Sequence, residues 1–229
     1  MIFKDLKRKK WGEIHKMFIN ICYDTKALNT EFSSYISSRT DTLLEYENND
    51  ELIDIINTKD IHFVITKYNF EFLKEIRILN KQIQIIAILD ELNHTHLLEG
   101  LEIRYVKFIQ RLDCVNAFID VLRDCVKNID SKKSNIITLK NGFIYDDYNK
   151  SLFKENSLIP LTKKELLFLN FLLKNHDSSI SYEEINTNIW NGSMTNDSLR
   201  SLVKELRKKT YKELIKNVSG MGYRIDTTQ

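Results

Sequence analysis

The chain has 229 residues, which suits one large domain or two of ordinary size. Its composition, with 42% hydrophobic and 29% charged residues, six glycines and one proline, is typical of a folded protein and excludes the disordered, collagen-like and low-complexity classes. No apolar run approaches the roughly 18 residues of a membrane-spanning helix, and residues 1–11 are polar and basic, unlike a signal peptide. We therefore expect a cytoplasmic protein with no membrane partner.

Short runs rich in β-branched and apolar residues recur through the first half of the chain and predict buried strands. Segments with helical spacing of apolar residues lie between and after these runs, the longest from Leu112 to Ile129. Strand and helix thus alternate five times, which predicts an α/β domain with a (βα)5 doubly wound, flavodoxin-like parallel sheet and helices on both faces. The predicted strands cover residues 17–22, 42–46, 61–66, 83–89 and 103–109.

The pattern changes after a polar stretch at residues 130–135, which we interpret as a linker. The linker separates an α/β domain at residues 17–129, preceded by an extension at residues 1–16, from an α+β domain at residues 136–229. The second domain is expected to begin with a strand-rich segment up to Leu161, to continue with three helices and to end in a hairpin. The predicted helices cover residues 162–174, 181–190 and 195–209, and the predicted hairpin covers residues 215–225.

The charge is distributed unevenly along the chain. Residues 1–130 carry a net charge of −3 and residues 131–229 carry +5, which gives +2 for the whole chain. The stretch from Thr195 to Arg224 holds eight basic residues against three acidic ones and accounts for the excess. A local cluster of this kind is typical of a surface that binds a polyanion.

The predicted helix at residues 195–209 has two unlike faces. The face expected to be buried carries an apolar stripe formed by Leu199, Leu202, Val203 and Leu206. The opposite face is small, polar and cationic, with Ser201, Lys204 and Lys208 at its centre and Arg200 and Arg207 on its flank. Such a face can enter a DNA major groove, where cations neutralise phosphates or donate to guanine. A solvated helix face is the alternative interpretation.

Four motifs follow one another in residues 161–225. They are Leu-Thr-x-x-Glu at 161–165, a helix ending in Trp190, the run Leu-Arg-Lys-Lys at 206–209 and Gly-x-Gly-Tyr-Arg at 220–224. Over nearly its whole length this segment resembles the winged-helix effector domain of OmpR/PhoB-type response regulators. The resemblance implies that the helix at residues 195–209 lies in the major groove and that the hairpin reaches the adjacent minor groove.

The resemblance also implies DNA contacts for Lys204, Arg207 and Tyr223, which match contacting positions of the family. Two positions depart from the family pattern, because Glu205 and Ser219 stand where arginine is common. We expect Glu205 to pair with a neighbouring lysine, Lys208 or Lys209, rather than to accept a hydrogen bond from cytosine. The predicted DNA-binding residues are Arg200, Ser201, Lys204, Arg207, Lys208, Lys216, Asn217, Tyr223 and Arg224.

Given such an effector domain, residues 17–129 resemble a receiver domain with a degenerate phosphorylation pocket. The family pattern has an acidic pair after the first strand, an aspartate after the third, a hydroxyl after the fourth and a lysine after the fifth. Here Asp24 is the one residue left of the pair, and no carboxylate occurs between Asp60 and Glu71. We therefore expect neither aspartyl phosphorylation nor a bound metal or cofactor. The degenerate pocket comprises Cys22, Tyr23, Asp24, Thr66, Lys67, Leu89 and Lys107.

Two features leave alternatives open. Lys67, at or beside the position of the missing acceptor, either pairs with Asp24 and imitates a fixed charge state or lies solvated at the strand end. Residues 1–16 form a surface helix or a DNA-contacting arm, or are upstream sequence read from an early start codon.

Three cysteines, Cys22, Cys114 and Cys125, are too few and too scattered for a disulfide framework or a zinc site. We expect them to fill the core, with redox sensing across a dimer as the alternative.

The predicted function is that of a sequence-specific, double-stranded DNA-binding transcription regulator of the response-regulator type, acting independently of aspartyl phosphorylation. The resemblance implies a homodimer, and RNA polymerase is a candidate further partner. The alternative is an interaction module, in which the degenerate receiver docks a protein and the winged helix does not read DNA. An enzyme is not expected, because the sequence offers no nucleophile–base pair, phosphate-binding glycine loop or metal constellation.

Overall fold

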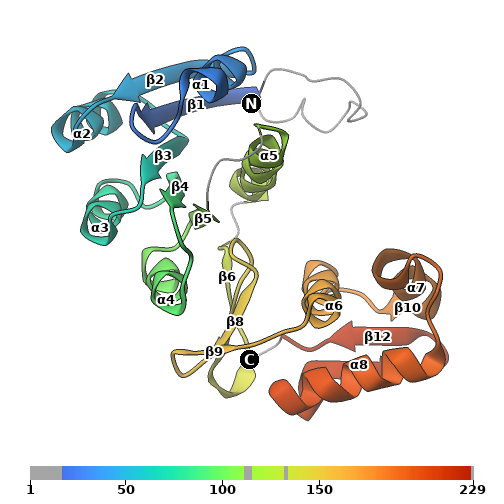
Figure 1. The fold of residues 1–229 in the computed structure, drawn as a ribbon. Coiled ribbons are helices and arrows are strands. Elements are labelled where there is room, and N and C mark those ends of the chain that lie inside the picture. The colour runs from blue at the N-terminus through green and yellow to red at the C-terminus, as the bar shows by residue number, and fades with distance from the viewer. Residues whose placement is uncertain (1–16, 111–114, 132–133, 228–229) are drawn as a thin grey trace. The chain divides into compact units, whose positions relative to one another are not determined.

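The computed structural model describes residues 17–110, 115–131 and 134–227. The chain divides into two compact units, with the boundary between Asn135 and Ile136 (Figure 1). Among the described residues, no helix is both long enough and apolar enough to cross a membrane.

The first unit is a parallel five-stranded sheet with strand order β2-β1-β3-β4-β5, as the alternation of strand and helix predicts. Its strands are β1 (Met17–Asp24), β2 (Thr40–Tyr46), β3 (Phe63–Lys67), β4 (Gln84–Leu89) and β5 (Val106–Gln110). Its helices are α1 (Thr30–Ser37), α2 (Asn49–Thr58), α3 (Phe70–Leu79), α4 (His94–Ile103) and α5 (Val115–Ser131).

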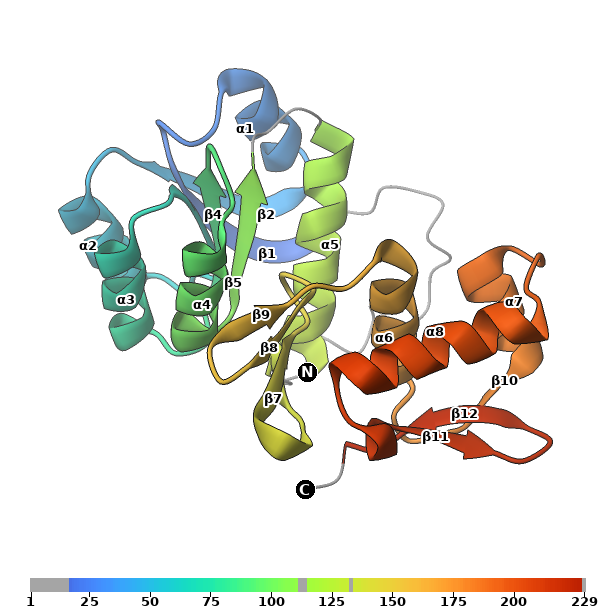
Figure 2. The ribbon, with the colours of Figure 1, turned by 60° about the horizontal axis from the view of Figure 1, so that its bottom comes forward.

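Helices cover both faces of this sheet (Figure 2). Helices α2, α3 and α4 lie on one face, over a buried cluster that includes Cys22, Leu52 and Leu73. Helices α1 and α5 lie on the other, where the rings of Phe32 and Phe118 meet edge to face with centroids 5.9 Å apart. Because both faces are covered, the central strands are continuously apolar rather than alternating.

Most strand boundaries differ from the sequence-based predictions by one to three residues, and two differences affect the end of the first unit. The fifth strand begins at Val106 rather than at residue 103, because α4 runs to Ile103 and a turn follows in which Arg104 and Tyr105 have φ of 58° and 47°. Arg77 holds this turn, since its guanidinium donates to the carbonyls of Ile103 (2.8 Å) and Arg104 (3.0 Å). Helix α5 continues to Ser131, so the first two residues of the predicted linker are helical.

The second unit is an α+β domain with two small sheets, of order β6-β7-β8-β9 and β10-β12-β11. Its strands are β6 (Ile136–Thr138), β7 (Phe143–Asp146), β8 (Ser151–Lys154), β9 (Ser157–Ile159), β10 (Ile180–Ser181), β11 (Ile215–Val218) and β12 (Gly222–Ile225). Its helices are α6 (Lys163–Lys174), α7 (Tyr182–Trp190) and α8 (Asn196–Lys209), with 3-10 turns η2 (Lys140–Gly142) and η3 (Lys212–Leu214).

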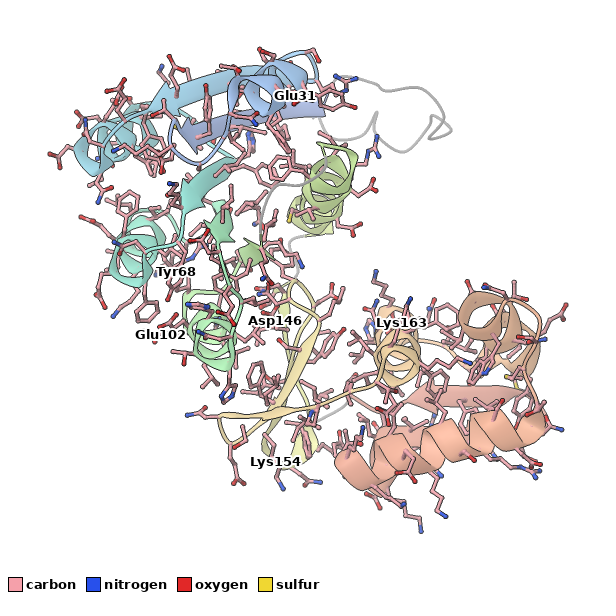
Figure 3. All side chains as sticks on the ribbon, viewed as in Figure 1. Glu31, Tyr68, Glu102, Asp146, Lys154 and Lys163 are labelled. Atoms are coloured by element: carbon pink, nitrogen blue, oxygen red, sulfur yellow. The ribbon has the colours of Figure 1, made fainter. Side chains whose placement is uncertain are left out.

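Side-chain caps fix where the helices of the second unit begin. Capping boxes join Thr162 with Glu165 and Ser181 with Glu184. Thr195 caps α8 in the same way. The turn between β7 and β8 is organised by buried Asp146, labelled in Figure 3, whose Oδ1 accepts a hydrogen bond from the backbone N–H of Tyr148 at 2.9 Å.

One core joins the helices and both sheets of the second unit. It contains Phe143 and Tyr145 from the first sheet, Leu169 from α6, Leu206 from α8 and Ile225 from the second sheet. Gly222 lets β10 and β12 approach each other, because a Cβ at this residue would lie 1.9 Å from the carbonyl oxygen of Ile180. Only glycine fits there.

Two leucines on α6 provide a matched test of this core. Leu169 is fully buried, whereas Leu167 is 41% exposed. We expect Leu169→Ala to lower the free energy of unfolding of the second unit by about 2 to 5 kcal/mol, because it leaves a cavity. Leu167→Ala is expected to change it by less than about 0.5 kcal/mol. Urea unfolding followed by Trp190 fluorescence, with Trp11 replaced by phenylalanine, measures both; equal effects would contradict the packing described.

Candidate nucleic-acid interface

Helix α8 presents the two faces that the sequence predicts. Leu199, Leu202, Val203 and Leu206 are buried in the core of the second unit. The opposite face is exposed and carries Arg200, Ser201, Lys204 and Lys208. The helix has a clear N-cap and three cations in its last turn, both of which suit the helix dipole. Its outward cations are therefore held on a rigid, well-packed element.

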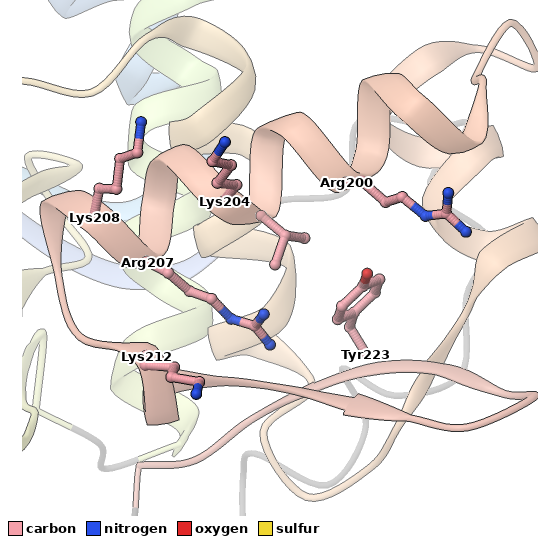
Figure 4. A pocket seen from close by; sticks show the side chains of 7 residues that line it. Arg200, Lys204, Arg207, Lys208, Lys212 and Tyr223 are labelled. Carbon is pink, nitrogen blue, oxygen red and sulfur yellow. The ribbon is translucent and has the colours of Figure 1, made fainter.

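An open hollow of about 440 Å³ lies between α8 and the β11–β12 hairpin. In Figure 4, Arg207 and Tyr223 lie between α8 and the hairpin, whereas Lys204 and Lys208 point away from the strands. Five of the seven lining residues are cations and none is acidic, which is the composition expected for an anion-binding surface. The hollow is lined by Arg200, Val203, Lys204, Arg207, Lys208, Lys212 and Tyr223.

Lys212 belongs to this surface although it is absent from the predicted site. It lies in η3, after the end of α8, and lines the hollow with the α8 cations. The one sign of its role in the sequence is that it lies in the basic stretch from Thr195 to Arg224. The turn that brings it back toward α8 cannot be derived from charge or periodicity.

Tyr223 is a core residue with its hydroxyl end at the hollow. The residue is 7% exposed, and its ring meets those of Phe168 and Tyr182 edge to face at 6.3 and 5.9 Å. Burial raises the pKa of its hydroxyl, whereas Arg207 and Arg200 act in the opposite direction. The hydroxyl therefore remains a neutral donor beside two guanidinium groups.

Arg207 is partly committed inside the protein. Its Nε donates to the carbonyl oxygen of Ile215 at 3.1 Å, and its Nη2 donates to the same oxygen. Arg207 thus joins α8 to β11 while its guanidinium still lines the hollow. We expect it to position the hairpin as well as to contribute charge.

Three predicted contacts lie elsewhere on the hairpin. Lys216 and Arg224 are paired across β11 and β12, on the face opposite to the one that Ile215 and Tyr223 turn toward the core. Lys216 also forms a 2.5 Å ion pair with Asp226, so its charge is neutralised locally. Exposed Asn217 accepts a hydrogen bond from the hydroxyl of Tyr182 at 3.2 Å. The structure therefore does not gather these three residues into the hollow.

Glu205 pairs with a lysine, as expected. The Nζ of Lys208 lies 2.7 Å from its Oε1. This pair is exposed, so it is readily broken when a stronger anion approaches Lys208.

Comparisons with known proteins agree with this geometry. Residues 155–225 match the family described as "Transcriptional regulatory protein, C terminal". Regulatory protein VanRB of Enterococcus faecalis is 33% identical over 70 residues, which cover 30% of this chain and 32% of that protein. The crystal structure of DrrB, an OmpR/PhoB homologue from Thermotoga maritima, is similar over 91% of this chain and 99% of that chain, with a TM-score of 0.67 at 16% identity. Residues 155–225 therefore match a transcriptional regulatory family, and the fold of the chain is similar to that of an OmpR/PhoB response regulator. The first unit has a receiver-like fold and the second unit has a winged-helix fold.

The register of the receiver sheet separates the residues of the predicted phosphorylation pocket. Tyr23 is in register with Ile65, Ile65 with Ile86, and Ile86 with Lys107, so these side chains share one face of the sheet. Their neighbours along each strand point to the other face. Cys22, Asp24, Thr66 and Leu89 therefore lie toward α2, α3 and α4, whereas Tyr23, Lys67 and Lys107 lie toward α1 and α5.

The structure shows the second of the two alternatives for Lys67. Its side chain is exposed at the end of β3, and no ion pair joins it to Asp24 in the part of the chain that is described. The Oδ1 of Asp24 instead accepts a hydrogen bond from the backbone N–H of Lys26 at 2.8 Å. The hypothesis of a fixed Lys67–Asp24 pair is wrong.

The residues at this edge of the receiver sheet do not fit the magnesium ion that phosphorylatable receivers hold. Asp24 supplies one carboxylate, and Thr66 and Leu89 are buried neutral side chains. Over residues 17–110, 115–131 and 134–227, no group of three or more His, Cys, Asp or Glu side chains is placed to hold a metal ion.

The cysteines that the structure describes are buried. Cys22 is fully buried, and burial, assisted by Glu51, raises the pKa of its thiol to about 12. Cys125 is 3% exposed on α5. Cys114 and residues 1–16, about which the sequence left alternatives, lie outside the described residues.

These environments predict low thiol reactivity. Because the thiolate is the reactive species, we expect Cys22 and Cys125 to resist iodoacetamide at pH 8 in the folded protein and to react fully in guanidinium chloride. Mass spectrometry of tryptic peptides measures the extent of alkylation at each position. Rapid alkylation of Cys22 in the folded protein would show that its environment is open.

Proposed function

We propose that the protein is a transcription regulator that binds double-stranded DNA in a sequence-specific manner through α8 and the β11–β12 hairpin. The observation that carries the proposal is the hollow beside α8, with five cations and no carboxylate among its lining residues. The match of residues 155–225 to a transcriptional regulatory family supports the same conclusion.

The geometry assigns different roles to the cations. Lys204 is exposed at the middle of α8, beside the small side chain of Ser201, so it is placed to donate to base edges in the major groove. Arg200 and Lys212, at the two ends of the hollow in Figure 4, are placed to neutralise phosphates of the flanking backbone. Lys216, with its internal ion pair, contributes less than its charge suggests.

The proposal includes independence from aspartyl phosphorylation. The absence of a carboxylate between Asp60 and Glu71, together with the exposed Lys67 at the end of β3, supports it. The proposal also includes a homodimer and a contact with RNA polymerase. Both rest on the resemblance to response regulators alone. The protein–protein interaction module is the competing function, and the DNA experiment below distinguishes it.

Selection from random duplex DNA with the untreated full-length protein tests the main proposal. We expect an enriched motif, and for that motif a log-log salt dependence of affinity with a slope of roughly −0.9 per neutralised phosphate. Lys204→Ala is expected to weaken binding by about 1 to 3 kcal/mol and to relax the preference at one base pair. Lys174→Ala, which removes an exposed lysine at the far end of α6, is the control and should have little effect. Failure of the protein to enrich any sequence would favour the interaction module.

Phosphodonor treatment tests independence from phosphorylation. We expect incubation with acetyl phosphate and Mg²⁺ to add no phosphoryl mass to the intact protein and to leave its DNA affinity unchanged, because the required nucleophile and metal ligands are missing. A conventional receiver treated in parallel controls for the reagent. A stoichiometric gain of one phosphoryl group on an aspartate would contradict this part of the proposal.

A further inference from the structure

The N-terminus of α6 holds a buried carboxylate. Glu165 is 3% exposed and completes the capping box of α6, with its Oε2 accepting a hydrogen bond from the backbone N–H of Thr162 at 2.7 Å. A cap alone does not need a buried residue, because Glu184 performs the same role for α7 at an exposed position.

The same oxygen of Glu165 binds a lysine from the last turn of α8. The Nζ of Lys209 lies 2.7 Å from Oε2 of Glu165 and donates also to the carbonyl oxygen of Pro160 at 3.0 Å. Burial acts to raise the pKa of Glu165, but the hydrogen bonds from Lys209 and Thr162 outweigh it and hold the pKa below its ordinary value. The carboxylate is therefore ionised at neutral pH, and the two residues form a charged pair that joins α6 to α8.

Lys209 and Arg207 hold the end of α8 from different elements. Arg207 is bonded to the carbonyl of Ile215 in β11, whereas Lys209 is bonded to α6 and to the segment before it. The first half of α8, which carries Arg200 and Lys204, packs on the core through apolar side chains, and these polar bonds at the other end add to what sets its direction. A small rotation at the fixed end displaces those cations, because the helix rises about 1.5 Å per residue.

We propose that Glu165 and Lys209 are positioning residues for DNA binding, which set the orientation of α8 and through it the placement of Lys204 and Arg200. This inference rests on the proposed DNA-binding function. Lys209 looks like a DNA contact by charge and position, but its ammonium group is engaged inside the protein.

Glu165→Gln separates positioning from electrostatics. Glutamine at this position keeps the capping box but removes the charged pair with Lys209. Removing a negative charge from a DNA-binding domain strengthens DNA binding on electrostatic grounds, so the proposal predicts the opposite sign. We expect the affinity of the full-length protein for its selected duplex to fall about tenfold, which corresponds to the loss of one good base contact.

Three further variants complete the experiment, measured by fluorescence anisotropy at fixed salt and well below the unfolding temperature. Glu184→Gln makes the same chemical change in the other capping box, where Glu184 has no lysine partner among the described residues, and should leave the affinity unchanged or slightly higher. Lys209→Met should weaken binding to a similar extent as Glu165→Gln. The variant that combines Glu165→Gln and Lys209→Met should bind no more weakly than the weaker of the two single variants, because each of these variants loses the same Glu165–Lys209 interaction.

The outcomes distinguish this inference from the function on which it rests. Unchanged or tighter DNA binding by Glu165→Gln overturns the inference. The inference also fails if Lys209→Met weakens DNA binding and reduces the log-log salt dependence of affinity by about one, because such a reduction marks the loss of a direct phosphate contact. If the wild-type protein binds no duplex, the proposed function fails, and amide hydrogen exchange then decides the inference. Glu165→Gln, but not Glu184→Gln, should speed exchange in the last turn of α8; equal exchange in both overturns positioning.

Discussion

The packing of the apolar stripe of α8 into the core of the second unit is the contact on which the candidate interface depends. Because Leu199, Leu202, Val203 and Leu206 are buried together, the remaining face of the helix must point to solvent. That face carries Arg200, Lys204 and Lys208, so burial of one side of the helix leaves these cations exposed on the other. The hollow beside α8 then arises because the chain returns through η3 and β11 to pack against the same helix.

Much of this arrangement follows from local sequence signals. A threonine or serine three residues before a glutamate marks the starts of α6 and α7, and the 3-4 spacing of apolar residues identifies the buried side of α8. The βα alternation likewise predicted the parallel sheet of the receiver. These signals succeed because caps and periodicity act over three to seven residues, within a single element.

The sequence does not reveal the interactions that join one element to another. Arg207 and Lys216 look like free cations in the sequence, but the carbonyl of Ile215 and the carboxylate of Asp226 reach them only in the folded domain. In the receiver, a strand start displaced from residue 103 to Val106 and a register that aligns Lys107 with Ile86 decide which face of the sheet each pocket residue occupies. Successive side chains of a strand point to opposite faces of the sheet, so a shift of one residue in the register moves each side chain to the other face. Composition does not determine the register.

The glycine where β10 pairs with β12 has a mechanical consequence for the proposed DNA binding. Gly222 allows β12 to pair with β10 on one side and β11 on the other, and β10 leads directly into α7. The hairpin is thus one edge of a three-stranded sheet anchored to a helix, and Arg207 attaches it to α8 as well. These contacts set the distance between α8 and the β11–β12 hairpin. The proposed DNA binding would therefore favour duplexes whose groove widths already match that distance, or deform to it at low energetic cost, even at base pairs that no side chain touches.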